Sequence, residues 1–182
     1  MTAPDSERSC VSRGMTLFSP LRAQRVTLPG LADVPAYAVS GTPVDCVRLA
    51  LGNLTAAPDM VISGINIGGN LGTDVLYTGT VAAAAEAALL GYQAVAVSIC
   101  SFRPEHLDTA AHFAKKAVSY VQANPLPFGT VLNVNVPDRE MDKLSGVMLA
   151  PAGVVQYTLP FIERADPSGM PYYWPPRGRS TC

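Results

Sequence analysis

The chain has 182 residues, of which 48% are hydrophobic and 15% are charged, and its formal net charge is -1 at pH 7. This composition is typical of one soluble domain with a sizeable apolar core. Its 13 Lys and Arg do not cluster and it contains a single Trp, which argues against a nucleic-acid groove with stacking aromatics, so we expect a small substrate.

The first half of the chain predicts a short strand followed by a helix. Residues 36–39 are the strand candidate, and the Thr42-Pro43 step predicts a helix start, because Pro suits the first helical position. Apolar residues then recur at helical spacing and predict one stripe that packs on a sheet. They are Val47, Leu51 and Leu54.

The middle of the chain predicts two buried strands with a helix between them. Residues 60–62 are an apolar run, as expected of a short strand buried on both faces. Residues 81–90 are nearly all Ala and Leu and predict a helix that lies close to the sheet, with Gly91 as its C-terminal cap. Residues 94–99 predict the next strand.

The second half predicts a surface helix over residues 104–123 and a strand over residues 131–136. His106 and His112 lie six positions apart and so on different helix faces, which excludes a chelating pair, and we expect both to be solvated. The strand-and-helix alternation predicts a layered α/β fold. The expected buried stripe of the helix is Leu107, Ala111, Ala114, Val118 and Val121.

Residues 58–86 outline an anion-binding site. Asn66 is expected at the end of the first buried strand, and a glycine-rich turn follows it, in which several N–H groups can converge on one oxyanion. Thr78 or Thr80 would cap the next helix, whose N-terminus favours phosphate. GxGxxG and Gly-Lys-Ser/Thr are missing, which argues against a nicotinamide enzyme and a P-loop NTPase. The glycines are Gly64, Gly68, Gly69 and Gly72.

Residues 64–86, GINIGGNLGTDVLYTGTVAAAAE, resemble the central signature of the SurE family of metal-dependent nucleotidases. Three further stretches agree in order and spacing, so the resemblance covers about residues 1 to 137. They are APDSERS at residues 3–9, SGTPVDCVRLAL at residues 40–51 and LNVNVP at residues 132–137.

The resemblance implies a Rossmann-like three-layer α/β/α sandwich that lacks the family's first strand and first helix, with the ligand at the C-terminal ends of the central strands. It also implies a metal-dependent phosphomonoesterase, a 5'-nucleotidase or acid phosphatase, that hydrolyses nucleoside 5'- or 3'-monophosphates or a similar small phosphomonoester. The implied cofactor is a divalent cation, Mg²⁺ or Mn²⁺.

By the same resemblance, Ser9 would be the hydroxyl ligand of the metal and Asn66 its amide ligand, and both would be the catalytic residues that remain. For Thr42 and Thr80, helix capping uses the same N–H groups and stays open as an alternative. Without the resemblance, Ser9 would be a solvated loop hydroxyl. The implied phosphate-binding residues are Gly41, Thr42, Gly68, Gly69, Asn70, Thr78, Gly79 and Thr80.

Family chains open with a hydrophobic strand that ends in Thr-Asn-Asp-Asp-Gly, whose Asp pair supplies the main carboxylates of the metal site. Here Met1-Thr2 already stand where the second strand should be finishing, and no Asp-Asp pair occurs in the sequence. We therefore expect a chain truncated at both ends, as an incomplete gene model or a natural remnant, with weakened metal binding and impaired activity. The remaining candidate carboxylate ligands are Asp5, Asp45 and Asp74. Of these, Asp5 could substitute in part for the missing Asp pair.

We divide the chain into a nucleotidase domain over residues 1–150 and an irregular tail over residues 151–182, in which Pro and Gly recur. In family members a β-hairpin arm follows and is exchanged between subunits, which implies a homodimer or homotetramer. The aromatic residues 172–174 are candidate oligomer contacts, and a loosely packed terminus is the alternative.

Two other classes of function stay open. One is a catalytically inactive remnant that binds phosphate or nucleotide, and the other is an assembly protein that uses an exposed sheet edge and the aromatic tail.

Four cysteines, Cys10, Cys46, Cys100 and Cys182, lie far apart without CxxC spacing, which predicts reduced thiols. No apolar stretch approaches a membrane span, and the N-terminus shows no signal pattern. We expect a cytoplasmic protein without a membrane or nucleic-acid-duplex partner.

Overall fold

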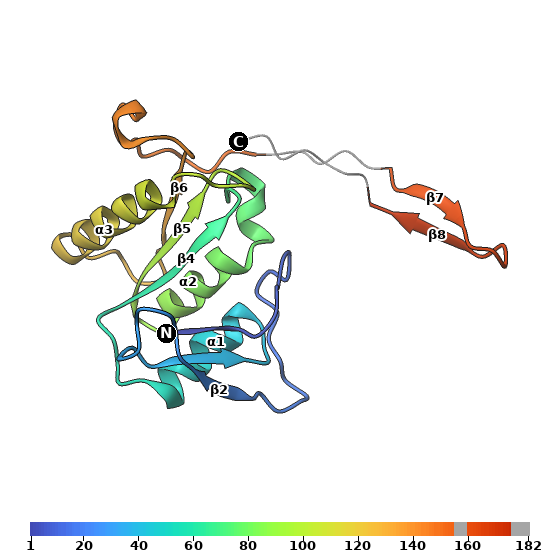
Figure 1. The fold of residues 1–182 in the computed structure, drawn as a ribbon, viewed down its shortest axis with the longest axis horizontal. Coiled ribbons are helices and arrows are strands. Elements are labelled where there is room, and N and C mark those ends of the chain that lie inside the picture. Colours follow the sequence, from blue (N-terminus) through green and yellow to red (C-terminus); the bar gives the residue numbers. More distant parts are fainter. Residues whose placement is uncertain (155–159, 176–182) are drawn as a thin grey trace.

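The computed structural model describes residues 1–154 and 160–175 (Figure 1). Cys182, whose thiol we predict to be reduced, and the rest of residues 176–182 lie outside these ranges. Within them the strands form two three-stranded sheets and one two-stranded hairpin.

The first sheet has the order β1-β3-β2, with β1 parallel to β3 and β2 antiparallel to it. The second sheet has the order β4-β5-β6 and is parallel throughout. No described strand pairs with the outer edge of β1 or of β4, so the two sheets are separate. The strands are β1 (Thr2–Pro4), β2 (Ala23–Val26), β3 (Ala36–Val39), β4 (Met60–Ile67), β5 (Gln93–Ile99) and β6 (Leu132–Val136).

Three α-helices and several short turns of helix connect the strands. The predicted strand at residues 36–39 is confirmed as β3, whereas the strand predicted at residues 60–62 extends to Ile67. The elements are α1 (Pro43–Leu49), η1 (Ala50–Leu54), η2 (Gly72–Leu76), α2 (Gly79–Leu89), α3 (Leu107–Ala123) and η3 (Met141–Lys143).

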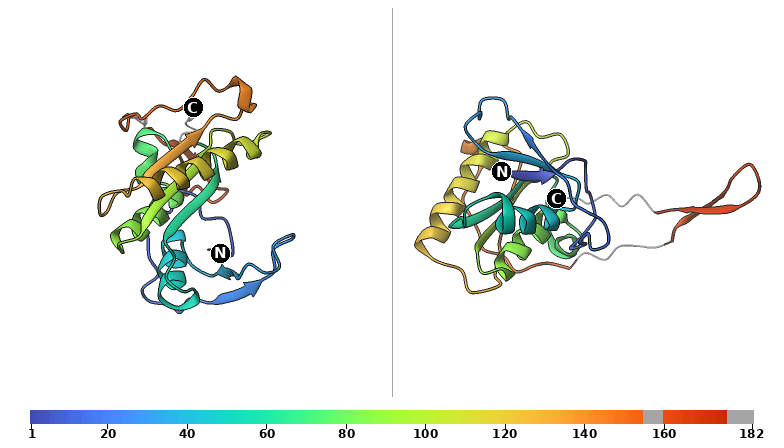
Figure 2. Two further views of the ribbon diagram at one scale, coloured as in Figure 1. Left: turned by 90° about the vertical axis from the view of Figure 1, so that its left-hand side faces the viewer. Right: turned by 90° about the horizontal axis from the view of Figure 1, so that it is seen from below.

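Strand β5 is the centre of the core, and its alternating side chains serve two faces. Ala94 and Ala96 pack against the Ala-rich α2, where small side chains allow the helix to lie close to the sheet. Val95 and Val97 point the other way and pack against Ala117 and Val121 of α3. Helices therefore cover both faces of the parallel sheet, and the predicted Rossmann-like α/β class is confirmed (Figures 1 and 2).

The buried stripe of α3 differs from the predicted one. Ala110 and Ala117 are buried where we expected Ala111 and Val118, and Leu107 is 46% exposed. Helix α3 starts late because His106 is its N-cap residue and is held by Asp138, and small Ala side chains then face the sheet. The predicted positions Ala114 and Val121 are confirmed, and the stripe differs from the prediction in the first part of the helix and at Ala117.

Part of the tail is regular, which corrects the expectation of an irregular segment. Residues Ile162–Ala165 (β7) and Pro171–Trp174 (β8) form an antiparallel hairpin whose residues are all exposed. Its turn is an Asp-Pro-Ser-Gly sequence, in which Asp166 accepts hydrogen bonds from the N–H groups of Ser168 and Met170. The hairpin lies apart from the sheets and helices (Figure 2).

Candidate functional site

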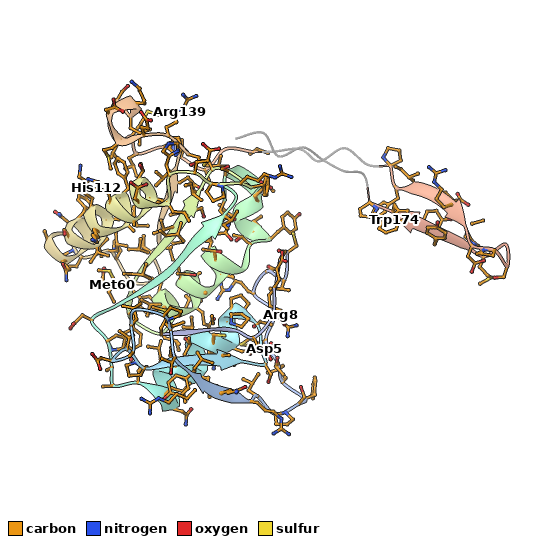
Figure 3. The ribbon with its side chains drawn as sticks, viewed as in Figure 1. Asp5, Arg8, Met60, His112, Arg139 and Trp174 are labelled. Carbon is orange, nitrogen blue, oxygen red and sulfur yellow. The ribbon has the colours of Figure 1, made fainter. Side chains whose placement is uncertain are left out.

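The loop that follows β1 lies against the start of α2. Ser12 donates its N–H to the carbonyl oxygen of Tyr77 at 2.9 Å and its hydroxyl to that of Leu76 at 2.7 Å. A Cβ on Gly79 would lie 2.7 Å from Pro43 of α1 and 3.6 Å from the carbonyl oxygen of Arg8. The N-termini of α1 and α2 and the loop around Ser9 therefore meet, on the side where Figure 3 labels Asp5 and Arg8.

Asp45 fixes the position of this loop relative to α1. Its buried carboxylate accepts hydrogen bonds from the N–H and hydroxyl of Thr16 and from the N–H of Thr42, at distances from 2.6 to 3.3 Å. Burial alone would raise the pKa of Asp45, but the hydrogen bonds from Thr16 and Thr42 lower it below its ordinary value. A charged Asp45 thus ties residue 16 to the helix start.

The two threonines at the helix starts are caps. Thr42 accepts from the N–H of Asp45 in a capping box and donates its hydroxyl to the carbonyl oxygen of Gly14. Thr78 is the N-cap of α2 and accepts from the N–H of Thr80 at 3.2 Å. The capping alternative is confirmed for Thr42, and Thr78 rather than Thr80 caps the second helix.

The glycine-rich turn lies on the C-terminal ends of the parallel strands. Gly68 has a φ of +102° and donates its N–H to the carbonyl oxygen of Ile99 at 3.0 Å. Asn66 donates its side-chain Nδ2 to the carbonyl oxygen of Gly68 at 2.7 Å. The turn between β4 and η2 is therefore fixed at the edge where ligands bind in open α/β sheets.

Asn70 is the second anchor of this turn, and its side chain points into the sheet. Asn70 is 5% exposed; its Nδ2 donates to the hydroxyl of Ser98 at 2.6 Å, and its N–H donates to Oδ1 of Asn135 at 2.8 Å. Asn133 and Asn135 both donate to the carbonyl oxygen of Asn70. Ser98, Asn133 and Asn135 were not predicted as site residues, although the two asparagines alternate with valines in the strand predicted at residues 131–136. Gly41 is also buried, against Leu21 and Asp45.

Ser9 and Asn66, the predicted metal ligands, have different hydrogen-bond partners. Ser9 is exposed and donates its hydroxyl to Glu7 at 2.7 Å, whereas Asn66 donates to Gly68. Within the described residues, no hydrogen bond joins Ser9 to Asn66.

The described residues do not fit a complete divalent-cation site. Mg²⁺ takes about six oxygen ligands and depends on carboxylates among them. No group of three or more His, Cys, Asp or Glu is placed to share a metal ion within residues 1–154 and 160–175. Of the carboxylates considered above, Asp5 lies 3.8 Å from Arg8 and accepts from Ser6, and Asp45 is occupied by Thr16 and Thr42.

We expected His106 to be solvated on a helix face, and this prediction is wrong. His106 is the N-cap residue of α3. Its Nδ1 lies 3.2 Å from Oδ1 of Asp138, which also accepts from the N–H groups of His106 and Glu105. Desolvation raises the pKa of Asp138, but these hydrogen bonds hold it below the ordinary value. The expectation for His112 is met, since its side chain is exposed.

An open pocket lies between the glycine-rich turn and the segments that follow β5 and β6. It is lined by Leu71 of the turn and by residues 100–101, 135 and 137–139. The predicted site residues do not line it, but Leu71 directly follows Asn70. In the part of the chain that the structure describes, no helix combines the length and apolar character that crossing a membrane requires.

Comparison with known proteins places these features in a family. The family model "Survival protein SurE" matches residues 1–158. A "5'-nucleotidase SurE" from Nitrosococcus oceani is 46% identical over 175 residues, which cover 96% of this chain and 67% of that protein. A protein of the same name from a Cyanothece species is 44% identical, with 96% and 65% covered.

Among solved structures, the crystal structure of the SurE protein from Aquifex aeolicus has a TM-score of 0.79 at 32% sequence identity. The match covers 96% of this chain and 69% of that chain. The chain spans about two thirds of the length of the curated relatives that it matches.

Proposed function

Because the chain belongs to the SurE family, we propose that it is a phosphomonoesterase that hydrolyses nucleoside 5'- or 3'-monophosphates. The observation that carries the proposal is the meeting of the Ser9 loop with the capped N-terminus of α2. The names of the relatives, 5'-nucleotidases, support the choice of substrate class.

The phosphate binds, in this proposal, between the glycine-rich turn and the start of α2. The N–H groups and positive dipole end of an eleven-residue helix favour a phosphate at Thr78, Gly79 and Thr80. Gly69 presents a backbone N–H group of the turn to the same oxygens. The N–H of Gly68 is bonded to Ile99, so Gly68 contributes by leaving no side chain in the way of the phosphate. Gly41 and Thr42 contribute from the neighbouring loop, and Asn70 positions the turn.

The contribution of this chain to the reaction is position and electrostatics. Main-chain N–H groups stabilise the charge that the phosphoryl oxygens carry in the transition state, and they are fixed before the substrate arrives. The hydrogen bonds of Asp45 to Thr16 and Thr42, and of Asn70 to Ser98, fix the segments that present these groups.

We propose that Mg²⁺ or Mn²⁺ takes part and binds weakly to this chain. Ser9 and Asn66 offer neutral oxygens, and neutral oxygens alone offset little of the cost of removing water from a hard cation. Calorimetric titration with each cation tests this, and a dissociation constant in the micromolar range would contradict weak binding.

The experiment that tests the function combines turnover and binding. Phosphate release from nucleoside 5'- and 3'-monophosphates is measured in Mg²⁺ and in Mn²⁺, and nucleotide binding is measured by calorimetry. Thr78→Val removes the hydroxyl at the helix start, Thr78→Ser retains it, and Thr55→Val is a matched change at an exposed position. Turnover lost only in Thr78→Val supports the proposal.

Two other outcomes count against the hydrolytic function. Nucleotide binding without phosphate release selects the inactive nucleotide-binding remnant instead. Absence of both binding and turnover contradicts the assignment to nucleoside monophosphates.

We also propose a cytoplasmic location, which the cysteines support. Among the described residues, Cys10 and Cys46 are free thiols. Burial, together with the nearby charges of Asp45 and Asp5, raises the pKa of Cys46 to about 12, so this thiol is an inert core residue. Free thiols are usual in a reducing compartment.

A further inference from the structure

The pocket beside the glycine-rich turn has the size of a small-molecule site. Its volume is about 580 Å³, within the range of roughly 300 to 1,000 Å³ that is typical of ligand pockets. It opens at the C-terminal ends of β5 and β6, where Figure 3 labels Arg139. Leu71 connects its wall to the proposed phosphate-binding turn, so a ligand held by the turn has room to extend into this pocket.

Most polar groups in the pocket wall are already engaged. Asn135 uses both its Oδ1 and its Nδ2 on the main chain of Asn70. The carboxylate of Asp138 accepts from Glu105 and His106, and the hydroxyl of Ser101 accepts from the N–H of Arg103. These groups build the wall and leave little for a ligand.

Arg139 is the exception. Its main-chain N–H donates to the carbonyl oxygen of Pro137, while its side chain is exposed and forms no ion pair within residues 1–154 and 160–175. The remaining wall is apolar at Leu71 and Pro137. The pocket therefore offers apolar contact and a planar fork of donors, and it suits a flat ligand that carries acceptors.

A nucleobase has this chemistry. An arginine fork donates two parallel hydrogen bonds to adjacent acceptors, and the O6 and N7 atoms of a 6-oxopurine present such a pair. Adenine presents a donor at the position of O6, so it loses one of the two bonds.

We propose that this pocket holds the base of the nucleotide and that Arg139 selects 6-oxopurines over adenine. The inference deepens the proposed function and rests on it for the class of substrate. Arg139 is then a specificity-determining residue, while the phosphate contacts are made at the turn and at the start of α2.

The test uses nucleosides, which carry no phosphate, so it does not depend on metal binding or turnover. Calorimetry or NMR titration of the full chain should show inosine binding about tenfold more tightly than adenosine, the discrimination expected of one bidentate pair. Arg139→Met should weaken inosine binding about tenfold and adenosine binding by less, because adenosine loses only the bond to N7. Arg25→Met, at an exposed position of β2, is the matched control and should change neither.

Equal affinities for inosine and adenosine, an unchanged inosine affinity in Arg139→Met, or no nucleoside binding at millimolar concentration would each overturn the proposal. Retained thermal unfolding midpoints establish that both variants are folded. Phosphate release from nucleotides without nucleoside discrimination overturns the pocket assignment alone. Arg139-dependent inosine binding without phosphate release supports the pocket and contradicts the hydrolytic function.

Discussion

Glu86 of α2 accepts a hydrogen bond from Arg48 of α1, with 2.6 Å between Oε1 and Nη1. Its other oxygen lies 3.3 Å from Nη2 of Arg13, in the loop that carries Ser9. The Glu86 side chain is 9% exposed, whereas both arginines are about half exposed. One buried carboxylate therefore links both helices and the loop of the proposed site.

Replacing Glu86 with Gln should lower the free energy of unfolding by about 1–3 kcal/mol, because charge-assisted hydrogen bonds at a buried acceptor are lost. Urea denaturation measures the change. Asp142→Asn removes a carboxylate from the exposed pair with Lys143 and should change stability by less than about 0.5 kcal/mol. Similar losses of stability in the two variants would show that the Glu86 carboxylate contributes no more to the free energy of unfolding than an exposed ion pair does.

Gly68→Ala should disturb the turn more than a comparable substitution elsewhere. Its φ is +102°, and an added Cβ would lie 3.0 Å from the ring of Phe102. Gly91 has a similar φ of +90°, but no heavy atom lies within 4 Å of its Cβ position. Both changes carry backbone strain of about 1–2 kcal/mol, and only Gly68→Ala adds a displacement of the turn or of Phe102.

Calorimetry with inorganic phosphate separates the two glycine variants. Gly68→Ala should weaken phosphate binding, and Gly91→Ala should retain it. Equal phosphate affinity in both variants would remove the turn from the proposed site.

The acid stability of the chain should depend on Asp45. Its pKa in the folded state lies below the ordinary value of 3.8, so the charged form stabilises the fold above about pH 4, and this contribution is lost as the pH falls through the folded-state pKa. The free energy of unfolding of the unmodified chain should therefore exceed that of Asp45→Asn at pH 7, and the difference should shrink on acidification.

Chemical denaturation between pH 7 and pH 2 measures this difference. Asp33→Asn, at an exposed loop position, is the control and should keep the pH dependence of the unmodified chain. A difference between the unmodified chain and Asp45→Asn that is constant with pH would mean that the Asp45 charge does not contribute.

The exposed hairpin β7–β8 should control the oligomeric state. The rings of Tyr172 and Trp174 lie edge to face with centroids 6.5 Å apart, and both are exposed. We expect a dimer or tetramer by light scattering, because exposed clustered aromatics favour interfaces. The double change Tyr172→Ser and Trp174→Ser should lower the mass, whereas Tyr120→Ser, on the exposed side of α3, should not. An unchanged mass in the double variant would exclude the hairpin as the contact.

Local signals predicted much of the fold. Thr42-Pro43 predicted a helix start that the capping box and Pro at the first position confirm, and the Ala-rich segment predicted the helix that lies close to β5. The start of α3 was not predictable, because it depends on Asp138, which lies 32 residues beyond His106 in the chain. The hairpin was missed although its Asp-Pro-Ser-Gly turn is a local signal.

The sequence predicted which residues belong to the candidate site better than it predicted what each of them does. The resemblance identified the glycine-rich turn, but not that the Asn70 side chain is turned into the sheet, because its partners Ser98 and Asn135 lie on two other strands. The link between Glu86 and the Ser9 loop likewise joins distant segments, and no periodicity in one segment predicts it.

In the proposed function, phosphate binds between the glycine-rich turn and the start of α2. NMR titration of the isotope-labelled chain with inorganic phosphate tests it most directly, since backbone amide shifts report each N–H group. We expect saturable shifts concentrated at Gly68, Gly69 and residues 78–80. Shifts that follow the exposed Lys and Arg side chains instead, or that leave these amides unchanged at saturating phosphate, would contradict it.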